Sequence, residues 1–372
     1  MTVYNAINVE QGNYTMYIFK LSTEELLSNY TISSYDSARE TGYQRPPVES
    51  HYKKIARYLA DNDSEQILPM SIIAAVTEKD ISYQENIITI KNKLRIVDGQ
   101  HRIKAIEYLR DAKNFKYKRK YEELAAHYEF PIILLVAKEI DSALEIDTFI
   151  NINSKGKRVS INLAKELREK KMQAELVKHK VELTKDCYEN LATQTVKLLA
   201  HDTGSMWYDR IQMGDESGLQ KPVSIGTFAR SLKKITTRVA DMVASEKDCI
   251  SEEEARKTAG LIKNAVEQLW RTVQRRWPEC FDEPKQYNLL RGFGVSIIHR
   301  LFESCIRESQ FSDSWEMLQD AQKIFWQYLN ETDIEAEEWM IGGTFTGFSS
   351  EQGYGIIVDI LRGERAMSEL LD

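Results

Sequence analysis

The sequence has few cysteines and no long apolar run, and each absence excludes a class of protein. Its four cysteines are scattered and form no C-x-x-C pair. A zinc site needs close ligand pairs and a disulfide scaffold needs a denser pattern, so we expect free, structural thiols. No window holds the roughly 18 consecutive apolar residues of a membrane helix. The start MTVYNAINVEQGNY also lacks the basic and apolar regions of a signal peptide. We therefore expect a cytoplasmic protein without membrane contact.

The common nucleotide-binding and catalytic patterns are absent as well. There is no G-x-x-x-x-G-K-[ST] loop, and no G-x-G-x-x-G follows a strand. Spacing suggests neither a Ser-His-Asp triad nor a metal-binding His pair, and we expect His299 to be packed in a core. The six tryptophans lie mostly in helical stretches and are expected in the core.

The net charge of −7 argues against polyanion binding by the whole surface, but the charge is unevenly spread. Residues 110–120 carry six bases and one acid, and residues 154–171 carry seven bases and two acids. A local basic face therefore remains possible within an acidic chain.

The hydrophobic pattern predicts an α+β protein of two domains. Strand-like and helical segments alternate up to residue 157, with a strand over 14–22 and a hairpin joining 86–90 to 94–97 across Lys91-Asn92-Lys93. From residue 158 long amphipathic helices replace the strands. We expect a mixed α/β domain over 1–157 and a mostly helical domain over 158–372.

The stretch LRIVDGQHRIKAIEYL (94–109) runs from an apolar strand through a polar corner into a helix. Gly99 permits a sharp turn and close approach of a ligand, and the helix that begins near Gln100 offers free N–H groups to an anion. Arg102 suits phosphate, and His101 can exchange a proton near neutral pH. Asp98 could hold a Mg²⁺-bound water, orient Arg102 or cap the helix. The residues alone leave open a phosphate site or an ordinary polar turn.

Three segments together resemble one family. DGQHR at 98–102 is the signature of DGQHR-domain proteins, GYQRPP at 42–47 resembles their Gln-Arg element, and TFININSKGKRVS at 148–160 resembles their Asn- and Lys-rich element. Within that group the chain looks like the DndB type, associated with bacterial DNA phosphorothioation. The resemblance covers residues 1 to about 170, and no sharp motif extends it into the helical part.

The corner also resembles the wider ParB and sulfiredoxin fold, in which the same turn binds nucleotide phosphates. This resemblance implies a site for ATP or another nucleotide with Mg²⁺. The chain lacks the ParB Glu-Asn pair, so the nucleotide's identity does not carry over. The residues implied in phosphate binding are Gln44, Arg45, Gly99, Gln100, His101, Arg102, Asn151, Asn153, Lys155 and Lys157.

A second candidate surface lies in the basic stretches. Their bases, interleaved with Phe115 and Tyr117, suit a DNA backbone, and the alternative is a solvated loop between helix and strand. The candidate DNA contacts are Lys116, Lys118, Arg119, Lys120 and Arg158.

Three functions remain open at this point. The resemblance implies a transcriptional repressor that binds duplex DNA at the promoter of its own modification genes. The alternative is a nucleotide hydrolase or DNA-nicking enzyme, in which Asp98 or His101 handles protons or a Mg²⁺-bound water and Arg102 stabilises charge on phosphorus. A third reading is an adaptor that binds other sulfur-modification proteins. Self-association into a homo-oligomer is compatible with each reading.

Overall fold

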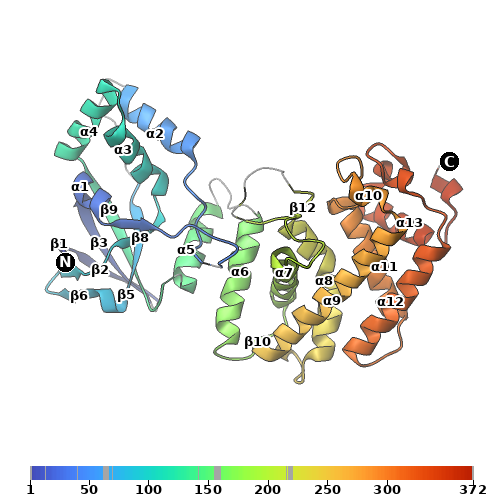
Figure 1. Ribbon diagram of the computed structural model, residues 1–372. Helices are drawn as coiled ribbons and strands as arrows, with labels where there is room; N and C mark the ends of the chain where they lie inside the picture. Colours follow the sequence, from blue (N-terminus) through green and yellow to red (C-terminus); the bar gives the residue numbers. More distant parts are fainter. Residues whose placement is uncertain are drawn as a thin grey trace. The chain divides into compact units, whose positions relative to one another are not determined.

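A computed structural model describes residues 2–12, 14–39, 41–61, 67–68, 70–140, 142–154, 161–214, 216 and 221–370 (Figure 1). Strands and helices both contribute, so the expected mixed α+β composition is confirmed. The chain forms two compact units, Met1–Val159 and Ser160–Asp372. In the part of the chain described here, no helix is long and apolar enough to cross a membrane.

The first unit is built on a six-stranded mixed sheet. In spatial order its strands are β2 (Ile7–Gln11), β3 (Tyr14–Ser22), β9 (Glu129–Ala137), β5 (Ile72–Thr77), β8 (Leu94–Asp98) and β4 (Tyr30–Ile32). β9 and β5 run parallel, as do β8 and β4, whereas β5 and β8 are antiparallel. The central strands β5 and β8 are mostly buried. β8 ends at Asp98, so its carboxyl end is the beginning of the DGQHR corner.

A smaller three-stranded sheet contains a hairpin that differs from the expected one. It consists of β1 (Thr2–Asn5), β7 (Ile87–Ile90) and β6 (Ile81–Gln84), with β7 in the middle. β7 pairs with β6 across Glu85 and Asn86, whose φ angles of 51° and 63° match the positive values of a two-residue hairpin turn. The hairpin prediction across residues 91–93 was therefore wrong, because β7 and β8 belong to different sheets.

Five helices accompany these sheets: α1 (Thr23–Ser28), α2 (Glu49–Asp61), α3 (Gln100–Asp111), α4 (Phe115–His127) and α5 (Ala143–Ser154). α3 packs in two directions: Ile103 and Ile106 join the core of the large sheet, and Leu109 packs with Leu59 of α2 and Leu124 of α4. Figure 1 shows α2, α3 and α4 grouped together. The corner residues at the start of α3 are thus anchored on both sides.

The second unit is helical. Its helices are α6 (Ile161–Leu176), α7 (Lys185–His201), α8 (Ile225–Val243), α9 (Glu252–Arg276), α10 (Glu279–Asp282), α11 (Gly292–Glu308), α12 (Ser314–Glu331) and α13 (Glu351–Leu361). Two short strand pairs connect them: β10 (Val181–Glu182) with β13 (Cys249–Ile250), and β11 (Ile211–Gln212) with β12 (Val223–Ser224). Short 3-10 turns are η1 (Glu78–Asp80) in the first unit and η2 (Ala336–Trp339), η3 (Thr344–Phe348) and η4 (Met367–Leu370) in the second.

Aromatic rings fill the core of the second unit. The Trp207 ring meets Phe228 and Trp270 edge to face, with centroids 4.7 Å and 4.9 Å apart. Four of the six tryptophans are buried as expected, whereas Trp315 and Trp326 on α12 are exposed. All four cysteines are free, in agreement with their scattered spacing.

Candidate functional site

The turn between β8 and α3 requires glycine on two grounds. Gly99 has φ of 105°, in the left-handed region that side chains other than glycine rarely adopt. A Cβ at this position would also lie 3.1 Å from Arg102 Nη2 and 3.1 Å from Ile72 Cγ1. The N-cap residue Gly99 has no side chain that could accept an N–H group of α3, and the Arg102 N–H donates to Gly99 O instead (3.0 Å).

The Arg102 guanidinium holds the corner to the loop before β5. Its Nη2 donates to Ser71 O (2.9 Å) and Asp98 Oδ2 (3.1 Å), and its Nη1 donates to Met70 O. Burial lowers the pKa of Arg102, and the Asp98 carboxylate opposes that shift. Of the three roles considered for Asp98, the structure shows that of orienting Arg102. Both residues have structural partners. The predicted phosphate contact of Arg102 and the predicted catalytic role of Asp98 stay predictions.

Two glutamines bring the Gln-Arg segment to the corner. Gln44 Nε2 donates to Val97 O (2.9 Å) and to Ile96 O, and Gln100 Nε2 donates to Arg45 O (3.2 Å). Because these partners are carbonyl oxygens, the orientation of both amides is settled. Each Oε1 atom is buried and has no hydrogen-bond donor among the described residues. The corner therefore holds two buried acceptors, and such atoms are costly to leave without a donor.

His101 is engaged by the segment that precedes α2. Its Nε2 accepts a hydrogen bond from the Val48 N–H (3.0 Å), so this nitrogen carries no proton. Its ring also lies 5.3 Å from the ring of His51, measured between centroids. A general-base role for Nε2 would require release of Val48, and the catalytic role of His101 remains a prediction.

The third segment of the resemblance lies on α5. Asn151 and Asn153 are in its second half, and Asn153 Nδ2 donates to Phe149 O within the same helix (2.8 Å). The Phe149 ring packs edge to face on Tyr43, whose neighbour Gln44 binds β8. The three segments quoted from the sequence thus meet around the end of β8. Lys155, Lys157 and Arg158 lie outside the described residues.

A buried ion pair that the sequence analysis missed supports this assembly. Arg95 on β8 binds Glu145 on α5 at two points, with Nη2–Oε1 at 2.7 Å and Nε–Oε2 at 3.2 Å. The Tyr43 hydroxyl donates to Glu145 Oε2 (3.1 Å). Arg95 and Ile96 are adjacent in the strand, so their side chains lie on opposite faces. Ile96 packs in the core with residues of α3, whereas Arg95 pairs with α5. The helices α3 and α5 therefore cover opposite faces of β8.

The basic stretch 110–120 is mostly helical and not the solvated loop considered as the alternative: its first two residues end α3, and residues 115–120 begin α4. α4 begins after Asn114, whose side chain accepts the Lys116 N–H (2.9 Å) as an N-cap. Phe115 is 79% exposed, and the side chains of Lys116, Lys118 and Arg119 are exposed too. Lys120 is partly covered and pairs with Glu123 (3.2 Å).

A serine–histidine contact in the second unit is structural and not a catalytic dyad. Trp270 Nε1 donates to His299 Nε2 (3.0 Å), so the proton of the neutral ring lies on Nδ1. Nδ1 then donates to Ser231 Oγ (2.7 Å), which itself donates to Phe228 O (2.7 Å). Burial lowers the pKa of His299 to about 3. The ring cannot accept the Ser231 proton, so His299 is a packed residue as expected.

No group of His, Cys, Asp and Glu side chains suited to a metal ion occurs among the described residues. A Mg²⁺ ion at the corner would have Asp98 as its acidic neighbour, and its side chain is about one-third exposed.

Comparison with known proteins identifies the family over most of the chain. Residues 4–331 match the DndB family, described as DNA-sulfur modification-associated. A search of curated proteins and of solved structures finds no match. The match spans the α/β unit and most of the helical unit, and so covers more of the chain than the three short segments do. The chain therefore belongs to the DndB family of DNA-sulfur modification-associated proteins.

Proposed function

We propose that this chain is a cytoplasmic DNA-binding regulator of the phosphorothioation system. In this account it binds duplex DNA at the promoter of its own gene cluster and represses transcription. Membership of the DndB family supports the association with DNA sulfur modification. The observation that carries the DNA contact is the cationic first half of α4.

The distribution of charges along α4 lowers the stability of the helix. Its first two turns hold four bases, whereas its acids Glu122 and Glu123 come later. The N-terminal end of a helix dipole is positive, so bases there are unfavourable by about 0.3–1 kcal/mol each. The same arrangement adds exposed side-chain cations to a helix end that attracts phosphate. A helix end that is less stable because of its bases, but has a high positive potential, is suited to a polyanionic partner. Membership of the DndB family makes DNA the partner that we propose.

The DNA contact is tested by reversing charge on α4. Each phosphate contact contributes about 0.9 to the slope of log K against log salt concentration. The variant Lys116→Glu/Lys118→Glu/Arg119→Glu should therefore bind a promoter duplex more weakly and with a slope reduced by about 2–3. The matched control reverses three exposed bases elsewhere in the first unit, Lys79, Lys91 and Lys93. Equal slopes for both variants would remove α4 from the DNA interface.

The DGQHR corner is proposed as a nucleotide site that regulates DNA binding, through a ParB-like arrangement. Its support is the uncapped start of α3 together with the buried oxygens of Gln44 and Gln100. The N–H groups suit a phosphate, and the two oxygens suit donors such as an amino group of a base or a water molecule. Binding of ATP with Mg²⁺ should be measured by calorimetry, and Gln100→Leu should weaken it if the corner is the site. Unchanged affinity in that variant would exclude the corner.

A nucleotide hydrolase or DNA-nicking enzyme is the second candidate. It is favoured by the partly exposed Asp98 carboxylate at the end of β8, whose Oδ2 lies 3.1 Å from Arg102 Nη2. Asp98→Asn keeps an acceptor for Arg102 and removes the charge. Release of phosphate from ATP with Mg²⁺, with and without DNA, should stop in that variant if Asp98 is catalytic. Equal turnover in the variant and the native chain would leave Asp98 structural.

A further inference from the structure

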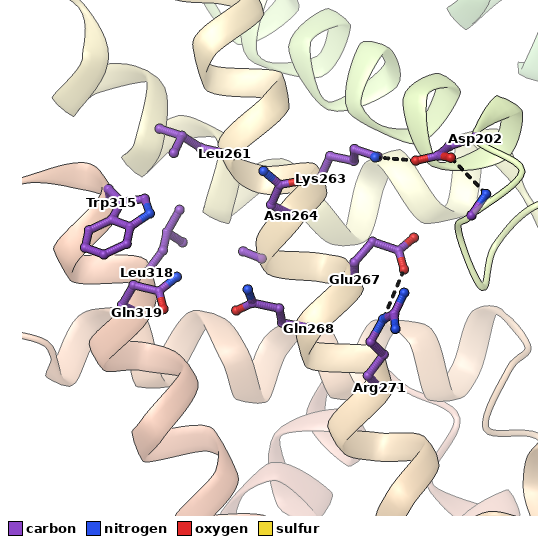
Figure 2. Close-up of a pocket in the computed structure, with 12 residues that line it drawn as sticks. Asp202, Leu261, Lys263, Asn264, Glu267, Gln268, Arg271, Trp315, Leu318 and Gln319 are labelled. Atoms are coloured by element: carbon purple, nitrogen blue, oxygen red, sulfur yellow. Dashed lines mark hydrogen bonds and ion pairs between the residues drawn. The ribbon is translucent and has the colours of Figure 1, made fainter.

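A groove runs between two neighbouring helices of the second unit, α9 and α12. Figure 2 shows its first part, a cavity of about 400 Å³ that includes Lys263, Glu267 and Trp315. A second cavity of about 530 Å³ includes Arg275, Lys323 and Trp326. The two cavities share Gln268, Arg271 and Gln319, so they form one continuous groove.

Two exposed tryptophans stand along one side of this groove. Trp315 is 58% exposed and Trp326 is 55% exposed, although the other four tryptophans are buried. They are eleven residues apart on α12, and eleven steps of about 100° bring a helical side chain back to nearly the same face. The rise per residue separates them by about 16 Å along the helix. The groove therefore carries two large aromatic faces with room for chain between them.

The lining between the tryptophans is cationic and rich in amides. Arg275 and Lys323 are exposed and form no ion pair within the described part of the chain. The acids are balanced: Asp202 binds Lys263, and Glu267 lies 3.9 Å from Arg271. The groove is therefore positive within a chain of net charge −7.

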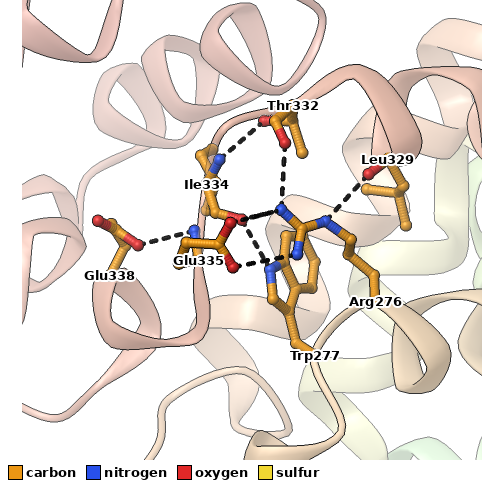
Figure 3. A network of polar contacts seen from close by, with 7 residues as sticks. All are labelled: Arg276, Trp277, Leu329, Thr332, Ile334, Glu335 and Glu338. Atoms are coloured by element: carbon orange, nitrogen blue, oxygen red, sulfur yellow. Dashed lines mark hydrogen bonds and ion pairs between the residues drawn. The ribbon is translucent and has the colours of Figure 1, made fainter.

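Hydrogen bonds fix the spacing of the two helices. Gln322 Nε2 on α12 donates to Ala265 O on α9 (2.7 Å). Figure 3 shows the end of α9, where Arg276 donates to Leu329 O (3.2 Å) and binds the Glu335 carboxylate. Trp277 Nε1 donates to Ile334 O in the same network (2.9 Å). The groove is thus preformed, and a ligand would not have to order it.

We propose that the α9–α12 groove binds single-stranded nucleic acid. Bases stack on Trp315 and Trp326, and the phosphates between them lie near Arg275 and Lys323. Aromatic faces combined with a cationic groove are the usual means of binding single strands, because every base presents a π-face. In a duplex those faces are covered by neighbouring base pairs.

An amphipathic peptide helix fits this groove less well than a single strand does. Such a helix needs a continuous apolar floor. Leu261 and Leu318 line the groove only in the cavity of Trp315, whereas its middle is formed by Gln268, Arg271 and Gln319. The inference concerns residues of the second unit alone, so it can be tested independently of the duplex contact proposed for α4.

The test measures binding of a fluorescent 20-nucleotide single strand to the full-length chain by anisotropy. Removing a stacking platform weakens such binding by about tenfold per base. Trp315→Ala and Trp326→Ala should each have that effect, whereas Trp315→Phe and Trp326→Phe keep a π-face and should lose much less. Arg275→Glu/Lys323→Glu should weaken binding, and Arg238→Glu, an exposed base on α8 outside the groove, should not.

Three outcomes would overturn the proposal. The first is single-strand affinity that is unchanged in the alanine variants. The second is equal loss of duplex binding in those variants, which would show that the tryptophans do not distinguish single strands from duplex. The third is competition by polyglutamate that is as effective as the oligonucleotide and independent of both tryptophans, which would indicate an acidic peptide. Reversal of the α4 charges should leave single-strand binding unchanged, so the two proposals fail independently.

Discussion

Arg95 and Glu145 join the central sheet of the first unit to α5 through a buried, two-point ion pair. Removing one member of such a pair leaves an uncompensated buried charge, which costs about 3–5 kcal/mol. Glu145→Gln should therefore destabilise the first unit by an amount in that range, measured by urea denaturation.

Replacing both partners should recover most of that loss, because apolar residues of similar size tolerate the same burial. The double variant Arg95→Met/Glu145→Leu is the comparison. As a control, Glu129→Gln breaks the exposed pair with Lys20 and should change the stability little. A single variant as stable as the control would contradict the structural role given to Glu145.

Two glycine-to-alanine substitutions should have opposite signs. Gly99→Ala forces alanine into a left-handed conformation and places its Cβ 3.1 Å from Arg102 Nη2, so we expect a loss of about 1–2 kcal/mol. Gly260→Ala adds a methyl group to open space inside α9 and should stabilise the protein by about 0.5–1 kcal/mol. Thermal unfolding of both variants tests the pair, and equal signs would refute the account of the corner.

The buried ring of His299 predicts a pH dependence of the second unit. Its pKa in the folded protein, about 3, lies below the usual value near 6.5, so the folded state resists protonation. The stability that depends on the neutral ring is present above pH 6.5 and is lost as the pH falls toward 3. At pH 5 the loss amounts to about 2 kcal/mol.

Comparison of two glutamine variants isolates this effect from the titration of carboxylates. His299→Gln removes the titrating group, so its free energy of unfolding should fall less between pH 7 and pH 5 than that of the native chain. His127→Gln removes an exposed histidine at the end of α4 and should follow the native curve. Parallel curves for all three proteins would show that His299 does not resist protonation.

Sequence patterns located most elements of the fold, and their failures have physical causes. α4 was missed although Tyr117, Tyr121 and Leu124 follow helical spacing and pack in one cluster, because only Leu124 of these three is an aliphatic residue and the bases between these positions dominate the segment. The N-cap Asn114 was a further available signal. The hairpin error arose because Glu85-Asn86 is an uncommon turn pair, whereas Lys91-Asn92-Lys93 lies between two apolar strands that enter different sheets.

The polar corner was recognised from the sequence, but its partners were not. Arg95 sits in an apolar strand and would face solvent if α5 did not cover that side, so its pairing with Glu145 depends on tertiary structure. The carbonyl partners of Arg102 and Gln100 come from backbone atoms, which leave no mark in a sequence. The sequence motifs showed which segments form the corner. The atoms that these segments bind depend on the tertiary structure.

Binding to promoter DNA compared with random DNA tests the central claim most directly. The measurement is the ratio of the two affinities of the full-length chain, at physiological salt, for the duplex upstream of its own gene cluster and for a scrambled duplex of equal length. A regulator should prefer its promoter by at least about tenfold, because specificity is a ratio of affinities. Equal affinity for both duplexes would contradict the proposed function.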